Sequence, residues 1–232
     1  MHSLAIDTSG PFCSLALARI EETAPAIIAE HHEPLARGHG ERLVPAIEAL
    51  LAKANVTYGA LERLAVGVGP GQFTGVRVAV AAARALALAL DLPCHPVTSL
   101  QALAARARCL DPQATAGRPL CVLLEARRGR VFTQGFAASG LAQDDIADLP
   151  LPDALAHTAT GAVLVTCGLA SAPLQGRPAV SVATVSAHAC LDAVAQRVAG
   201  DALPGSAIRP CYVRPPDAVA APRPVFGTAV HA

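Results

Sequence analysis

Apolar and polar positions recur along the chain with two different spacings, and these spacings predict its secondary structure. Short apolar runs bounded by glycine, proline and polar residues indicate strands, whereas apolar residues that return every three or four positions indicate helices. The predicted strands cover residues 2–7, 13–19, 26–32, 64–68, 94–97, 119–125, 130–137, 163–167 and 179–182. The predicted helices cover residues 41–54, 74–90, 98–110, 154–157 and 185–199.

Each half of the chain repeats the same order of elements. A β-hairpin is predicted at residues 2–19 and another at residues 119–137. Further strands and helices follow each hairpin, which is an α/β pattern in duplicate. The polar, turn-rich residues 111–118 separate the two halves. We therefore expect an N-terminal lobe, a C-terminal lobe and a proline-rich disordered tail at residues 1–110, 111–215 and 216–232, respectively.

A glycine-rich turn connects a predicted strand to the longest predicted helix. Its glycines, among them Gly69, Gly71 and Gly75, permit a positive φ and close approach of another backbone segment. The helix that follows offers unpaired N–H groups that could bind an anion. The turn is not a P-loop, because that motif needs a lysine and the only lysine is Lys53. A steric turn that holds the helix against its strand is favoured over contact with phosphate.

Asp7 ends the first predicted strand beside a turn rich in hydroxyl groups. Such an aspartate could hold hydrated magnesium in a nucleotide enzyme, or it could cap its own turn. Residues from this turn and from the glycine turn make a possible vestigial nucleotide site, comprising Asp7, Ser9, Gly10, Gly69, Gly71 and Thr74.

The helix at residues 74–90 is apolar around nearly its whole circumference. An ordinary surface helix is apolar along one stripe only. Arg77, Arg84 and the terminal Asp91 are the charged residues of this segment. One face can pack on the chain's own sheet, and we expect the other to bind a partner protein.

Composition restricts the class of protein. Of the 232 residues 53% are hydrophobic, and the formal net charge is zero, which argues against autonomous binding of nucleic acid. The seven cysteines show no CxxC spacing, so free thiols in a reducing cytoplasm are expected. No signal-peptide pattern and no uncharged apolar run long enough to cross a membrane is present, so we expect a soluble, cytoplasmic protein.

Two groups of polar residues have a functional and an ordinary interpretation. His39 is followed four positions later by Leu43, so the helix lacks the second histidine of a zinc pair, and no metal site is expected. Arg127, Arg128 and Arg130 stand in the turn of the second hairpin. They could bind phosphate or RNA, but a solvated turn is favoured.

Several segments, taken together, resemble the TsaB family, whose members take part in the threonylcarbamoyl-adenosine modification of tRNA. The resemblance extends to about residue 214, and the GPGQFTGVR segment is its most specific part. The supporting segments are LAIDTS, HGERLVPAIEALL, LPCHPVTSLQALA, EARRGRVF and RPCYVR.

The resemblance implies a two-lobed actin/sugar-kinase/Hsp70-like fold and a non-catalytic role. TsaB-like proteins pair with the catalytic TsaD subunit, a TsaE-like ATPase docks on the pair, and TsaC-type enzymes supply threonylcarbamoyl-AMP. TsaB would meet tRNA only through this complex and would form a homodimer in isolation. Where a nucleotide enzyme has an Asp-x-Gly turn, this chain has Glu125-Ala126-Arg127, which argues against tight nucleotide binding. No cofactor is expected to be required, although weak ATP or ADP with magnesium at the partner interface stays open.

The family pairs through helices of its first lobe. The resemblance therefore implies that the helices at 41–54 and 74–90 form the interface, through Leu43, Ile47, Leu50, Val76, Val80, Ala83 and Leu86.

Two enzymatic alternatives remain. A small ATPase or kinase would use Asp7 and the glycine turn, and magnesium-dependent ATP turnover by the isolated chain would support it. A metallopeptidase is suggested by the former classification of relatives as glycoproteases, and stoichiometric zinc would support it.

Overall fold

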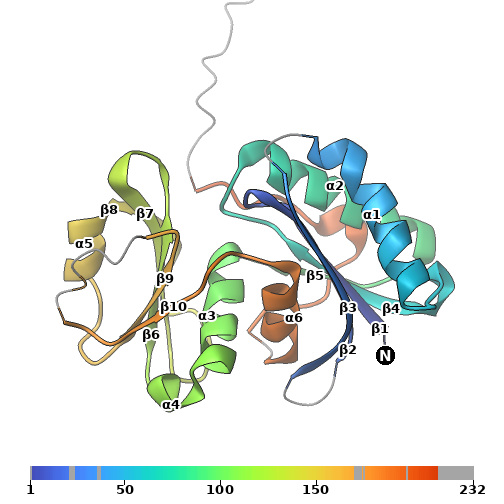
Figure 1. Ribbon diagram of the computed structural model, residues 1–232. Coiled ribbons are helices and arrows are strands. Elements are labelled where there is room, and N and C mark those ends of the chain that lie inside the picture. The colour runs from blue at the N-terminus through green and yellow to red at the C-terminus, as the bar shows by residue number, and fades with distance from the viewer. Residues whose placement is uncertain are drawn as a thin grey trace, which may run out of the picture.

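The computed structural model describes residues 2–20, 24–35, 38–169, 174, 176–196 and 198–213. These residues form two five-stranded sheets, with two helices standing between them and other helices on the outer faces (Figure 1). The expected α/β architecture with a duplicated sheet is confirmed. The proline-rich residues 216–232, expected to be a disordered tail, lie outside the described residues.

The first sheet has the strand order β3-β2-β1-β4-β5. β1 pairs antiparallel with β2 and parallel with β4. β2 pairs antiparallel with β3, and β5 continues the parallel part. The strands are β1 (His2–Asp7), β2 (Phe12–Ile20), β3 (Pro25–Pro34), β4 (Leu61–Gly67) and β5 (Cys94–Val97).

Both faces of the first sheet are covered, and alternate residues of β1 show why. Leu4 and Ile6 point to the outer face, where α1 (His39–Lys53) and α2 (Phe73–Leu90) pack. Ala5 points to the inner face, toward α6 (Ala187–Ala195). A strand that is buried on both faces needs apolar residues at consecutive positions, which is the pattern of this segment.

The second sheet repeats this topology with the order β10-β9-β6-β7-β8. A hairpin and a third antiparallel strand form one side, and two parallel strands form the other. A short helix, α5 (Leu151–Ala156), lies on its outer face. The strands are β6 (Leu120–Glu125), β7 (Arg130–Phe136), β8 (Ala147–Pro150), β9 (Val163–Cys167) and β10 (Ala179–Ser181).

Each of the two helices between the sheets packs against the sheet that the other half of the chain forms. α3 (Ser99–Leu110) follows the first sheet in sequence but packs against β6, β7 and β9 of the second. α6 follows the second sheet but packs against β1, β2 and β4 of the first. The two helices also contact each other, as Figure 1 shows, so one continuous apolar core joins both sheets.

The chain returns to the first sheet after α6. Leu203 forms an antiparallel bridge with Cys94, and the Cys211 N–H donates to the Val68 carbonyl oxygen over 2.7 Å. A 3-10 turn, η3 (Gly205–Ala207), packs on α2. Residues 205–212 therefore flank α2 on one side, while α1 flanks it on the other.

Three local expectations differ from the structure. Residues 139–152 were expected to be loop but include β8. This strand is held at the sheet edge by its pairing with β7 and by a hydrogen bond from Arg130 Nε to Asp148 over 2.8 Å. The short helix α4 (Pro112–Thr115) lies in the expected turn region, capped by Asp111. The last helix ends at Ala195 instead of residue 199.

Candidate functional site

The turn after β1 and the glycine turn before α2 pack directly against each other. The Thr8 hydroxyl donates to the Gly75 carbonyl oxygen over 2.6 Å, and the Gln72 N–H donates to the Ser9 carbonyl oxygen over 2.7 Å. A Cβ on Gly75 would clash with the Thr8 carbonyl oxygen, and a Cβ on Gly71 with that of Ser9. The glycines permit close backbone approach, as the steric interpretation of this turn expected.

Asp7 lies buried at the base of this junction. Its Oδ1 accepts hydrogen bonds from the N–H and the hydroxyl of Ser9, both at 3.1 Å. Burial raises the pKa of the Asp7 carboxyl from 3.8 to about 6, and the hydrogen bonds from Ser9 offset only part of that rise. A Cβ on Gly67 would clash with this carboxylate. The carboxylate therefore caps its own turn inside the fold.

Of the six candidate nucleotide-binding residues, the structure brings Asp7, Ser9, Gly69 and Gly71 together as packing partners. Asp7 and Ser9 are buried, and the Gly69 carbonyl oxygen accepts from the Ser99 N–H over 2.9 Å. Thr74 is exposed in the first turn of α2. The polar groups closest to the turn are thus already engaged within the chain.

The facing turn of the second lobe has a different chemistry. Ala126 leads into the 3-10 turn η2 (Arg127–Gly129), and Glu125 is exposed, with its carboxylate beside Gly168. On the first-lobe side, Gly10 faces the hydroxyl of Thr184, in the segment that leads to α6. An acidic side chain and a Cβ therefore stand where a phosphate-binding turn would present glycine N–H groups.

The side chains expected at a protein interface are mostly core residues. Six of the seven are buried on the outer face of the first sheet, and only Leu86 is partly exposed. These side chains pack within the chain itself, because an amphipathic stripe points first to the chain's own sheet, and their part in an interface stays a prediction. The six buried residues are Leu43, Ile47, Leu50, Val76, Val80 and Ala83.

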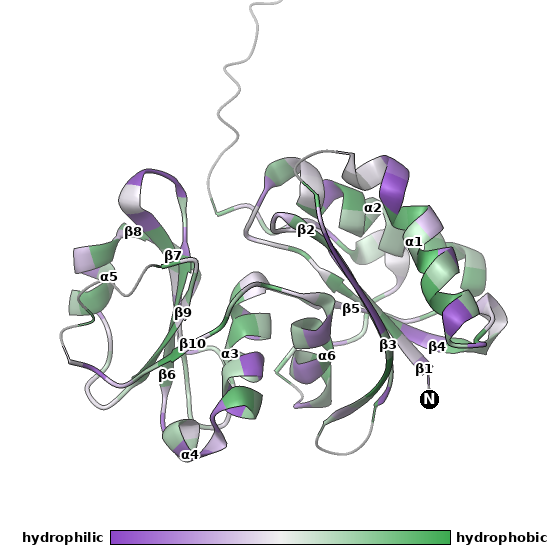
Figure 2. Cartoon of the chain, viewed as in Figure 1, coloured by the Kyte–Doolittle hydropathy of each residue, from purple (hydrophilic) through white to green (hydrophobic). Residues whose placement is uncertain are grey.

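The opposite faces of α1 and α2 carry exposed apolar side chains. Leu88 is 83% exposed, Val44 52% and Phe73 45%. Figure 2 shows hydrophobic residues along both helices. By length and composition alone α2 could cross a membrane, yet a third of it is buried in the fold. The sequence did not single out Leu88, Val44 or Phe73, because a helix apolar all round does not reveal which face is covered.

Arg77 joins α2 to the C-terminal segment at the surface. Its Nε donates to the Tyr212 hydroxyl over 2.7 Å, and its guanidinium carbon lies 3.7 Å from the centroid of the Phe73 ring. The two rings lie 5.4 Å apart, centroid to centroid. Phe73 and Arg77 belong to the GPGQFTGVR segment and Tyr212 to RPCYVR, so these two segments form one surface cluster.

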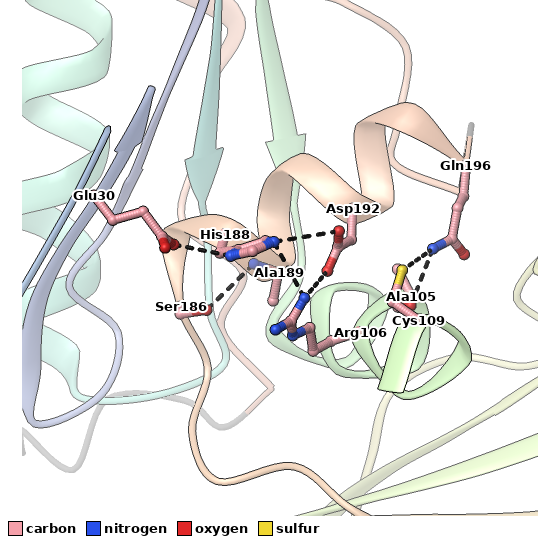
Figure 3. Close-up of polar contacts among 9 residues, drawn as sticks. All are labelled: Glu30, Ala105, Arg106, Cys109, Ser186, His188, Ala189, Asp192 and Gln196. Atoms are coloured by element: carbon pink, nitrogen blue, oxygen red, sulfur yellow. Dashed lines mark hydrogen bonds and ion pairs between the residues drawn. The ribbon is translucent and has the colours of Figure 1, made fainter. Parts of the chain in front are cut away.

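A polar network joins the two middle helices to the edge of the first sheet (Figure 3). His188 Nδ1 lies 2.9 Å from the Glu30 carboxylate, and its Nε2 lies 3.1 Å from Arg106 Nη1. Arg106 also donates to the buried Asp192 over 3.2 Å. Because a guanidinium only donates, His188 Nε2 is the acceptor and the proton of the neutral ring lies on Nδ1, toward Glu30.

The remaining candidate groups are the metal-ligating side chains, the cysteines and the arginine turn. Among the residues that the structure describes, no group of three histidine, cysteine or acidic side chains could hold a metal ion. The cysteines are free, as expected. Arg130 is bound to Asp148, so only Arg127 and Arg128 of the arginine turn are exposed.

Comparisons with known proteins agree on one family. A family model described as "TsaD: tRNA N6-adenosine threonylcarbamoyltransferase" matches residues 31–151. The tRNA threonylcarbamoyladenosine biosynthesis protein TsaB of Bacillus subtilis is 39% identical over 133 residues, which are 57% of this chain and 54% of that protein. The chain spans about half the length of the curated relatives that it matches.

Solved structures extend the similarity over the fold. YeaZ from Pseudomonas aeruginosa superposes with a TM-score of 0.71 at 28% identity, covering 91% of this chain and 99% of that one. A polyphosphate/ATP-glucomannokinase from Arthrobacter has a TM-score of 0.51 at 11% identity, covering 85% of this chain and 98% of that one, a likeness of fold alone.

Proposed function

The chain belongs to the TsaB (YeaZ) family within the TsaD superfamily, and on this premise we propose that it is a non-catalytic partner subunit in tRNA modification. Its partner would be a TsaD-like catalytic subunit, which transfers a threonylcarbamoyl group to the adenosine next to the anticodon. A TsaE-like ATPase would dock on this pair in the cytoplasm, and tRNA would be reached only through the complex.

The exposed apolar faces of α1 and α2 carry this proposal. Leu88 and Val44 protrude from neighbouring helices, and the small residues Ala81 and Ala85, on either side of Arg84 in α2, are also exposed. Large apolar patches on a soluble protein mark sites of association. A standard interface buries about 800 Å² on each partner, an area that two adjacent helix faces can supply. In the absence of the partner, the same faces would form a homodimer.

The engaged polar groups of the first-lobe turn support a non-catalytic role. Ser9 and Asp7 bind each other, and the neighbouring glycine turn fills the space next to them. Burial of the Asp7 carboxylate leaves it poorly placed to bind magnesium. We therefore propose that the chain needs no cofactor, and that ATP or ADP with magnesium binds at most weakly, at the interface with the partner.

Light scattering of the chain mixed with its purified TsaD-like partner tests the proposal. We expect a one-to-one complex, weakened by Leu88→Glu because that change places a charge in the contact. Leu141→Glu is the matched control, because Leu141 is 62% exposed but lies on the second lobe. A mixture that stays dissociated would contradict the proposal, and magnesium-dependent ATP turnover by the chain alone would favour the ATPase alternative.

A further inference from the structure

A groove of about 360 Å³ runs along α2, on the side that faces the C-terminal segment. Val80 and Ala81 contribute its apolar floor, and arginines stand toward both ends. Arg77 and Arg84 are seven residues apart, so they are separated by two helical turns, or about 10.5 Å along the axis. The lining residues are Arg77, Val80, Ala81, Arg84, Pro210 and Tyr212.

The positive charge of this groove is not neutralised within the part of the chain that the structure describes. The lining includes no acidic residue. Arg77 uses Nε for the Tyr212 hydroxyl, which leaves its two terminal amino groups available, and Arg84 has no hydrogen bond or ion pair with a described residue. In a chain of zero net charge, this is a local excess of two cations beside an apolar surface.

Arg77 is held in position before any partner binds. Its guanidinium stacks on Phe73 and is bonded to Tyr212, which is 46% exposed. A long side chain that is already ordered loses less freedom on association. Arginine and aromatic residues are also the types that contribute most at protein interfaces. The cluster therefore resembles a preformed anchor more than a solvated surface.

We propose that the groove receives a helix of the catalytic partner subunit that presents two carboxylates two turns apart, one to Arg77 and one to Arg84. Small apolar residues on that helix would pack over Ala81 and Val80, as an amphipathic helix does in a groove. The proposal rests on the proposed function and specifies the chemistry of the partner. Charge complementarity at this position would set the register of the two helices.

Arg84→Glu is the sharpest test, because Arg84 has no hydrogen bond or ion pair within the described residues that the substitution would remove. Binding of the full chain to the purified catalytic subunit is measured by calorimetry at about 50 mM and about 300 mM NaCl. We expect about tenfold weaker binding at the lower salt concentration and a smaller effect of salt than in the wild type. Arg127→Glu makes the same charge change on the second lobe and should bind normally.

A second variant examines the anchor without changing charge. Tyr212→Phe removes only the hydroxyl that holds Arg77, so we expect a loss of affinity of about two- to fivefold. Unchanged binding of Arg84→Glu would overturn the groove assignment and leave the proposed function intact. Absence of binding by the wild type would overturn both. The inference would also be overturned if the chain alone bound ADP, Arg84→Glu abolished that binding, and pairing with the catalytic subunit were unchanged. That result would assign the groove to phosphate.

Discussion

The hydroxyl of Thr8 donates to the carbonyl oxygen of Gly75 over 2.6 Å, and so bonds the turn after β1 to the first turn of α2. The two residues are 67 positions apart in the chain. This contact fixes where α2 begins relative to the first sheet. The direction of α2, and with it the surface that the helix presents, depends on a backbone approach that only glycine allows.

Gly75→Ala should destabilise the protein by about 3 kcal/mol or more, because the new methyl group would overlap the Thr8 carbonyl oxygen. Urea denaturation followed by circular dichroism measures the loss. Gly59→Ala is the control, because a Cβ there meets nothing within 4 Å and the backbone is not in the left-handed region. Equal stability of the two variants would contradict the packing argument.

Asp7→Asn should stabilise the protein at neutral pH. The pKa of Asp7 is raised from 3.8 to about 6, so the folded state holds this proton more tightly than the unfolded chain does. The resulting contribution to stability is fully present below pH 3.8 and is lost as the pH rises through about 6. The difference amounts to about 3 kcal/mol.

Chemical denaturation of Asp7→Asn and the wild type between about pH 4 and about pH 8 measures this effect. The asparagine oxygen can still accept a hydrogen bond from Ser9, so the turn is preserved. The advantage of the variant should grow as the pH rises. An advantage that does not vary with pH would mean that the carboxylate is not desolvated in the folded protein.

Arg106→Ala should destabilise the protein by about 3–5 kcal/mol, because the buried Asp192 would lose its guanidinium partner. Arg42→Ala removes the ion pair with Glu33, which is shorter, at 2.6 Å, but lies on the surface. We therefore expect this variant to lose about 1 kcal/mol or less of stability. Thermal unfolding of both variants compares them. Similar losses would show that the network between the middle helices contributes no more than a surface pair.

Val80→Arg should prevent folding instead of blocking association. Val80 is 4% exposed and packs in the core under α2, where a charged side chain has no partner. The family resemblance made Val80 a candidate contact, but Val80 is nearly buried, so Leu88, which is 83% exposed, is the better position for testing association. Soluble expression and circular dichroism distinguish the cases: Leu88→Glu should retain the wild-type spectrum, and a well-folded Val80→Arg would contradict the packing.

Strong periodicity made most of the fold predictable. The stripe of Leu43, Ile47 and Leu50 indicates a helix, and the apolar runs flanking turn residues indicate the two hairpins. β8 was missed because Ala147–Pro150 has no β-branched residue and its pairing with β7 is set by the sheet edge. The exchange of α3 and α6 was not predictable, because spacing indicates a helix but does not specify which sheet it covers.

The sequence identified residues of the candidate site, but it did not show how these residues face one another. The glycine turn and Asp7 were identified, and their proximity was confirmed, since both lie at ends of neighbouring parallel strands. Tyr212 could be connected with Arg77 only through the fold, because 135 positions separate them. A short segment such as RPCYVR shows no periodicity, so beyond the family resemblance nothing in the sequence indicated where Tyr212 would lie.

The exchange of the middle helices has a consequence for how the chain can be divided. A fragment that ends after α3 would leave the inner face of the first sheet bare, and the remaining fragment would lack the helix that covers the second sheet. Neither fragment should be soluble alone, although the two together could reconstitute the molecule. The two repeated sheets therefore do not mark two separable units, since each sheet depends on a helix that the other half of the chain supplies.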